Sequence, residues 1–242
     1  TLFELCKVTL DDGVVGVGET MVYYTWGATT DDAVRRTIGR SALELMWDDS
    51  LGAGLQAALF DAVGRSLDAP IHQLLGEKVR DKAPLSWWSI DMPAEDWAAE
   101  CQDALRHGYV SCKFKARPWF DLQEQLRIAT ASLPDHFEID LDFNAMLLDS
   151  AHALRVIDGL SGHSRVKILE SPIPQSDVAG GRFLRAHSRI PIALHAESPP
   201  LAVSLAENLC DGYVVSGGVS RVLREAHAIA EANKVLWLQL VG

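Results

Sequence analysis

The hydrophobic and polar residues of this 242-residue chain follow one pattern up to about residue 80 and another after it. Residues 5–10 and 14–19 alternate between apolar and polar on either side of the turn sequence DDG at 11–13, which predicts a β-hairpin. Two helical stretches follow, the second with apolar residues at helical spacing. We therefore expect an N-terminal α+β domain over residues 1–80.

A regular alternation of strand-like and helix-like segments begins near Pro84. Strands are expected at 85–90, 109–116, 137–143, 166–169, 190–194, 212–215 and 235–241. Helices are expected at 93–107, 121–132, 149–160, 181–187, 201–209 and 221–232. Such a repeat predicts a parallel sheet of right-handed βα units and favours a TIM-type barrel over an open doubly wound sheet. No GxGxxG sequence follows the first strand, so a dinucleotide-binding fold has no support.

The expected barrel domain covers residues 81–242 and lacks its final strand. A barrel of this type closes with eight strands, and an open edge exposes unpaired backbone groups. Only seven strand patterns are present after residue 81.

Composition narrows the class of protein. The formal net charge of −11 argues against a general nucleic-acid-binding or anionic-membrane surface. No apolar run approaches the roughly 18 residues of a membrane span. The four cysteines are scattered without a CxxC pair, which favours reduced thiols. With no signal peptide visible, we expect a cytoplasmic protein.

Two lysines share one face of the second barrel strand. In the stretch SCKFKARP at 111–118, alternation places Lys113 and Lys115 on the face opposite Cys112 and Phe114. Two adjacent ammonium groups on a solvent-exposed edge strand would discourage aggregation. Inside a barrel they would need acidic partners.

Acidic groups end the next three strands. The polar side chains that share a face near these strand ends are Glu138, Asp140, Asp142 and Asn144 on the third, Glu170 on the fourth, and His195 and Glu197 on the fifth. Active sites of such barrels lie at the carboxyl ends of the strands. Three carboxylates from adjacent strands form an oxygen-rich site that suits Mg²⁺, although each residue alone could be a helix cap or a surface group.

Six motifs in chain order resemble the mandelate racemase and muconate lactonizing enzyme branch of the enolase superfamily. They are DDGVVGVGE at 11–19, AALFDAVG at 57–64 with PIHQLLG at 70–76, KFK at 113–115, DFN at 142–144, ESP at 170–172 and SGGV at 216–219. The resemblance covers nearly the whole chain. It implies a modified (β/α)7β TIM barrel with an N-terminal α+β capping domain.

The resemblance also implies a chemistry. A Mg²⁺-dependent lyase or isomerase of this branch abstracts a proton α to the carboxylate of a small-molecule substrate and forms an enediolate intermediate, as a dehydratase, cycloisomerase or epimerase. By the same resemblance the metal ligands are Asp142, Glu170 and Glu197. Lys115 is the acid or base, and Lys113 contacts the substrate carboxylate. A homo-oligomer is expected.

Some positions depart from the family pattern. The sixth strand carries no lysine, and the seventh carries no histidine to pair with Asp211. Asp211 precedes the strand core and could equally be structural. The fifth strand ends LHAES at 194–198, so that Glu197 would ligate in an altered register and His195 could lie in the barrel mouth or be structural. One-base chemistry is therefore expected rather than two-base racemisation.

Two other functions stay open. A degenerate member could keep the barrel and the metal without turnover, which the absent sixth-strand lysine motivates. A Schiff-base aldolase could use Lys113 or Lys115, but it would leave the three carboxylates without a role.

Overall fold

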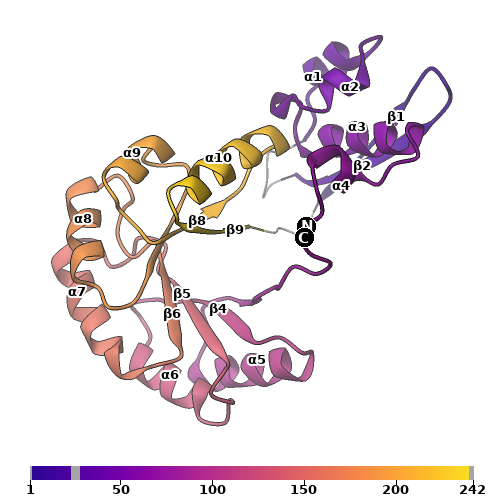
Figure 1. Ribbon diagram of the computed structural model, residues 1–242. Coiled ribbons are helices and arrows are strands. Elements are labelled where there is room, and N and C mark those ends of the chain that lie inside the picture. The colour runs from indigo at the N-terminus through magenta and orange to yellow at the C-terminus, as the bar shows by residue number, and fades with distance from the viewer. Residues whose placement is uncertain (1, 23–27, 240–242) are drawn as a thin grey trace. The chain divides into compact units, whose positions relative to one another are not determined.

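A computed structural model describes residues 2–22 and 28–239 of the chain (Figure 1). The chain divides into two compact units. One comprises the residues up to Ala83 together with Val215–Ala228 and the described residues from Leu238 on, and the other comprises Pro84–Val214 with Ile229–Trp237. The domain limits expected from the sequence, 1–80 and 81–242, stay predictions, because the first unit also takes in a segment from near the C-terminus.

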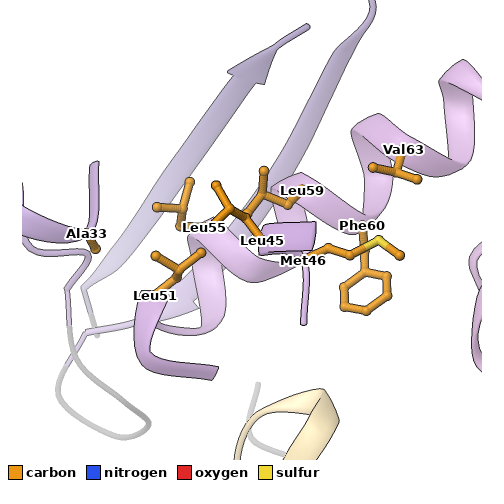
Figure 2. Packing of buried hydrophobic residues seen from close by; sticks show 8 residues of the cluster. All are labelled: Ala33, Leu45, Met46, Leu51, Leu55, Leu59, Phe60 and Val63. Atoms are coloured by element: carbon orange, nitrogen blue, oxygen red, sulfur yellow. The ribbon is translucent and has the colours of Figure 1, made fainter. Parts of the chain in front are cut away.

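The first unit contains the expected hairpin. Its elements are β1 (Phe3–Thr9), β2 (Val15–Met21), α1 (Asp31–Thr37), α2 (Ala42–Leu45), the 3-10 turn η1 (Asp49–Leu51), α3 (Ala53–Ser66) and α4 (Ile71–Leu75). Strands β1 and β2 pair antiparallel, with Leu5 opposite Glu19. Buried apolar side chains of this unit gather in one cluster, formed by Ala33, Leu45, Met46, Leu51, Leu55, Leu59, Phe60 and Val63 (Figure 2). Cys6 and Val8 of β1 pack against this cluster.

Helix α3 lies directly on the backbone of β2. A Cβ added at Gly16 would lie 2.2 Å from the carbonyl oxygen of Ala58, and one added at Gly18 would lie 2.2 Å from that of Gly54. The glycines of the DDGVVGVGE motif therefore allow the helix and the hairpin to approach more closely than any side chain would permit.

Replacing Gly16 by alanine is expected to lower the free energy of unfolding by about 1–3 kcal/mol, because the new methyl group forces α3 away from the hairpin. Urea unfolding, followed by circular dichroism, measures the change. Val17→Ala is the matched control, since the Val17 side chain on the same strand is 51% exposed. Equal losses in the two variants would show that the close approach does not limit stability.

The start of helix α10 (Val219–Glu231) is held by η1 within the first unit. The Asp49 carboxylate accepts hydrogen bonds from the backbone N–H groups of Ser220 at 3.0 Å and Arg221 at 2.8 Å. A Cβ added at Gly218 would lie 2.2 Å from Asp49 Cγ, so this position has no room for a side chain. The SGGV motif thus forms the start of α10, where free backbone N–H groups donate to a carboxylate from η1.

The second unit is built on a seven-stranded sheet in the order β3-β4-β5-β6-β7-β8-β9. Its strands are β3 (Trp87–Ser89), β4 (Ser111–Lys115), β5 (Glu138–Asp142), β6 (Val166–Glu170), β7 (Ile192–His195), β8 (Gly212–Val215) and β9 (Val235–Leu238). Its helices are α5 (Ala94–Arg106), α6 (Leu122–Thr130), α7 (Ser150–Gly159), the 3-10 turn η2 (Leu160–Gly162), α8 (Val178–His187) and α9 (Leu201–Ala206). Strands β3 to β8 pair in parallel.

This sheet confirms the predicted TIM-barrel-like alternation of strands and helices. The sheet curls, and α5 to α8 lie along its outer face (Figure 1). The strands follow one another in chain order, as successive right-handed βα units require. Positions 240 and 241 of the last expected strand lie outside the described residues.

Aspartates start three successive helices of the second unit. The side chain of Asp121 accepts from the N–H groups of Gln123 and Glu124, that of Asp149 from His152, and that of Asp177 from Gly180. Each aspartate supplies an oxygen to N–H groups that have no partner within the helix. These caps fix the residue at which each βα loop ends and the helix after it begins.

The two faces of β4 differ as the alternation predicts. Cys112 and Phe114 are fully buried, and the Phe114 ring stacks on Trp97 of α5 with centroids 4.2 Å apart. Lys113 and Lys115 extend from the opposite face, where their side chains stay about one fifth exposed at 18% and 19%. Helix packing on one face of β4 therefore directs both lysines to the inner face of the sheet.

Candidate active site at the carboxyl ends of the strands

The two lysines of β4 meet two carboxylates from the neighbouring strands. Lys115 Nζ lies 2.5 Å from Asp142 Oδ2, and Lys113 Nζ lies 2.6 Å from Glu170 Oε2. Lys113 Nζ is also 3.5 Å from Asp142 Oδ2. Asp142 and Glu170 are 0% and 1% exposed. The pairing registers explain this meeting, because Lys115 lies opposite Asp142 and Asp142 lies opposite Glu170.

The chain turns sharply after each of these carboxylates. Asn144 and Ser171, which follow Asp142 and Glu170, have φ angles of +47° and +46°. This left-handed conformation is uncommon for residues with a side chain, and it tends to occur at functional sites. The turn at Asn144 lets its backbone N–H donate to Asp142 Oδ1 at 2.9 Å, which orients the carboxylate.

Arg117 supports the same carboxylate from the β4 side. Its guanidinium donates to Asn144 Oδ1 at 2.8 Å and to the carbonyl oxygen of Asp142 at 3.2 Å. Arg117 was not singled out from the sequence, although it continues the alternation of Lys113 and Lys115. Asn144, expected near the site, is therefore held between Arg117 and Asp142.

His195 closes the cluster at the end of β7. Its Nε2 lies 3.1 Å from Glu170 Oε1, so Glu170 has Lys113 on one oxygen and His195 on the other. The backbone N–H of His195 donates to Gln175 Oε1 at 2.7 Å, and Gln175 Nε2 donates to the carbonyl oxygen of Ser198. Gln175 lies in a loop, where no sequence pattern marked it. The structure thus brings His195 to the lysine and carboxylate cluster.

Two carboxyl groups in this region have shifted pKa values of opposite sign. Burial alone would raise the pKa of Glu170, but the His195 hydrogen bond and the Lys113 ammonium outweigh it and lower the pKa to about 2. Burial raises the pKa of Asp140, two residues before Asp142 on the same face of β5, to about 7. Lys113 counteracts that rise, while Glu138 and Glu170 add to it.

Stability of the metal-free protein is expected to fall as the pH rises from about 4 to about 7. The folded state holds a proton on Asp140 in this range and the unfolded state does not, so ionisation favours unfolding. Asp140→Asn should remove this loss and raise the free energy of unfolding at pH 8 by about 2–4 kcal/mol, with little change near pH 4. Urea unfolding at several pH values tests this, with Glu95→Gln, an exposed acid of α5 that does not act on Asp140, as the control. An unchanged pH slope in Asp140→Asn would refute the assignment.

Two more site residues were expected from the sequence, Glu197 and Asp211. Glu197 is exposed in the turn after β7. Asp211 lies just before β8, where it accepts from the Ile192 N–H at 3.0 Å and pairs with Arg185. These contacts place Asp211 at the amino ends of the strands, opposite the lysine cluster, and they suit the structural alternative. The ligand role of Glu197 stays a prediction.

Comparison with known proteins places this arrangement in a family. The family model for enolase C-terminal domain-like proteins matches residues 96–238, which covers more than half of the chain. The chain belongs to this family. The relatives described in the next paragraph place it in the mandelate racemase and muconate lactonizing enzyme branch, as the six sequence motifs predicted.

Two curated enzymes and one solved structure illustrate the relationship. Muconate cycloisomerase 1 of Pseudomonas putida is 28% identical, covering 94% of this chain and 68% of that enzyme. The N-succinyl-L-Arg/Lys racemase of Bacillus cereus is 22% identical, covering 78% of this chain and 57% of that enzyme. The structure of an enolase from Bradyrhizobium complexed with magnesium and mandelic acid has a TM-score of 0.80 at 25% identity, covering 99% of this chain and 74% of that one. This enolase-family chain is thus related to isomerases, and it spans only part of their length.

The Bradyrhizobium enolase structure contains magnesium, and the donor set of this family member decides whether it could hold the same ion. Across residues 2–22 and 28–239, no group of three or more His, Cys, Asp and Glu side chains is arranged to hold a metal ion. Asp142 and Glu170 nevertheless converge on one cation, because Lys113 Nζ lies within 4 Å of an oxygen atom of each. Mg²⁺ is commonly bound by one or two carboxylates together with water and substrate oxygens. The residues present therefore fit Mg²⁺ at this pair.

No helix in the described part of the enolase-family chain has the length and apolar character needed to cross a membrane.

Proposed function

We propose that this protein is a Mg²⁺-dependent lyase or isomerase that removes a proton α to the carboxylate of a small acid. The observation that supports this proposal most directly is the convergence of two ammonium groups and two buried carboxylates at the ends of β4, β5 and β6. This cluster contains both a proton-transfer group and a cation-binding pair. Family membership is consistent with it, since the curated relatives are a cycloisomerase and a racemase.

Lys115 is the proposed acid and base. After its ammonium group has released a proton to solvent, the Lys115 amine takes the α-proton from the substrate, and the ammonium group so formed can return that proton to another atom on the same side. Asp142, at 2.5 Å, holds the Lys115 side chain in place and balances its charge after proton transfer. The stem of Lys115 is fixed by β4, whose other face is packed against α5.

Lys113 and the groups around Glu170 bind and orient the substrate in this proposal. The Lys113 ammonium lies beside Lys115 on the same face of β4 and attracts the substrate carboxylate. His195 holds one oxygen of Glu170 in a fixed position. Asp142 is held likewise by the N–H of Asn144. The cluster is thus ordered by its own hydrogen bonds.

Asp142 and Glu170 would hold Mg²⁺, with Glu197 proposed as a third ligand. When bound, Mg²⁺ supplies Lewis-acid stabilisation of the negative charge that develops on the substrate carboxylate.

The sequences of strands β8 and β9 favour a reaction on one side of the substrate. Strand β8 has the sequence GYVV and β9 has VLWL, so neither carries a lysine or a histidine. The Tyr213 hydroxyl is buried and is hydrogen-bonded to Ser204. A single acid–base group can both remove and return a proton in a dehydration or a cycloisomerisation. We therefore favour those reactions over two-base racemisation.

Exchange of α-protons in D2O tests this function. A panel of sugar acids, N-acyl amino acids, dipeptides and muconate is incubated with the protein, and deuterium incorporation is followed by NMR with Mg²⁺ and with EDTA. We expect exchange for at least one acid, and we expect EDTA to remove it. No exchange on a broad panel, despite clear Mg²⁺ binding, would instead support a metal-binding member without turnover.

A further inference from the structure

The ammonium group of Lys113 lies at the point where Asp142 and Glu170 converge. We propose that Lys113 is a built-in counter-cation, which Mg²⁺ displaces on binding and which then becomes available to an anionic substrate. This inference rests on the proposed function, because it assumes that Asp142 and Glu170 are the Mg²⁺ ligands. It adds a coupling between metal binding and anion binding that passes through one side chain.

The charges of the cluster balance in the absence of metal. Asp142 and Glu170 are fully buried and carry two negative charges, and Lys113 and Lys115 carry two positive charges at 2.5–2.6 Å from them. Buried carboxylates need such partners, since an unpaired buried charge is strongly unfavourable. Adding Mg²⁺ to the intact cluster would leave two excess positive charges in a buried region. An ammonium group must therefore move away or gain an anionic partner.

Geometry identifies Lys113 as the group that moves. Lys113 Nζ contacts Glu170 Oε2 at 2.6 Å and Asp142 Oδ2 at 3.5 Å, so it bridges the two carboxylates. Among the residues that the structure describes, Lys115 pairs with Asp142 alone. A cation bound through Glu170 Oε2 and Asp142 Oδ2 would occupy the region that Lys113 Nζ fills. Mg²⁺ binds oxygen at about 2.0–2.1 Å, which leaves no room for the ammonium at its present distance.

Displacement changes what Lys113 can bind. While Lys113 bridges the two carboxylates, their negative charges balance the charge of its ammonium group. The ammonium group then attracts an anion only weakly. Once Mg²⁺ replaces it, the charge of Lys113 is free on the same inner face of β4, beside the metal. Mg²⁺ and a carboxylate ligand should therefore strengthen each other's binding, and thermodynamic linkage requires the effect to be reciprocal.

Isothermal titration with MgCl2 in a buffer free of carboxylates tests the inference. The variants are Lys113→Met, which removes the competing charge, and Lys113→Gln, which also keeps a polar end group. Lys167→Met is the matched control, because Lys167 is an exposed lysine on β6. We expect both Lys113 variants to bind Mg²⁺ at least about tenfold more tightly than the unaltered protein, and Lys167→Met to bind it equally.

A second arm repeats the titration of the unaltered protein with saturating lactate as the probe anion. The Mg²⁺ affinity should rise at least about fivefold, and this rise should be smaller in the Lys113 variants. Because this arm includes the unaltered protein, its result can be interpreted even where a variant fails to fold. Mg²⁺ affinity that lactate leaves unchanged, or that is equal or weaker in folded Lys113 variants, would overturn the inference. If α-proton exchange still required Mg²⁺ in that case, the proposed function would stand, whereas a complete absence of Mg²⁺ binding would overturn both.

Discussion

Replacing Lys115 by methionine is expected to slow α-proton exchange by about 10²- to 10⁴-fold, the usual contribution of a general acid or base. Methionine keeps most of the length of the lysine stem but cannot carry a proton. The loss should appear in the turnover rate, because the group acts on the reacting carbon and Mg²⁺ is proposed to bind through Asp142 and Glu170. NMR measurement of deuterium incorporation under saturating substrate and Mg²⁺ gives the rate.

Two comparisons keep this result interpretable. Lys167→Met removes an exposed lysine of the same sheet and should leave exchange unchanged. Titration with MgCl2 should show that Lys115→Met still binds the metal, which separates proton transfer from damage to the metal site. Exchange at the unaltered rate in Lys115→Met would show that another group performs the proton transfer.

Replacing Trp97 by alanine is expected to lower the free energy of unfolding by about 3–5 kcal/mol. Trp97 is fully buried, its ring stacks on Phe114, and its Nε1–H donates to the carbonyl oxygen of Ile90 at 3.2 Å. The substitution removes a large apolar surface and leaves a cavity between α5 and β4. Because β4 carries both lysines, exchange activity should become more sensitive to temperature as well.

Chemical unfolding with guanidinium measures this loss, and Trp119→Ala is its control. Trp119 is 60% exposed, so its removal should change the free energy of unfolding by no more than about 0.5 kcal/mol. Trp97→Phe should retain more stability than Trp97→Ala, because an aromatic ring still fills part of the site. Similar losses in Trp97→Ala and Trp119→Ala would contradict the view that α5 and β4 are joined through this stack.

The sequence predicted the elements of the second unit because their patterns are local. A strand repeats every two residues and a helix every 3.6, so each element can be recognised without knowing its neighbours. The segment 111–115 illustrates this, since its alternation alone indicated that Lys113 and Lys115 share a face. Arg117 continues that alternation and could have been included for the same reason.

Contacts between strand ends were harder to predict from the sequence. The position of His195 stayed open between a structural role and the barrel mouth, because its environment depends on Glu170, 25 residues earlier. Gln175 had no signal, since a loop residue belongs to no periodic pattern. Asp211 was a candidate only by position along the chain, and the structure places it at the amino end of β8, with Arg185 and Ile192.

The sequence by itself therefore determined the order of strands and helices, the family and the inner face of β4, because each depends on residues close together in the chain. Tertiary structure decided how those faces meet. Only the pairing registers of β4, β5 and β6 bring Lys113 within reach of both Asp142 and Glu170. Charge balance in a buried cluster depends on distances between strands, and these distances are set by sheet pairing and helix packing across the whole unit.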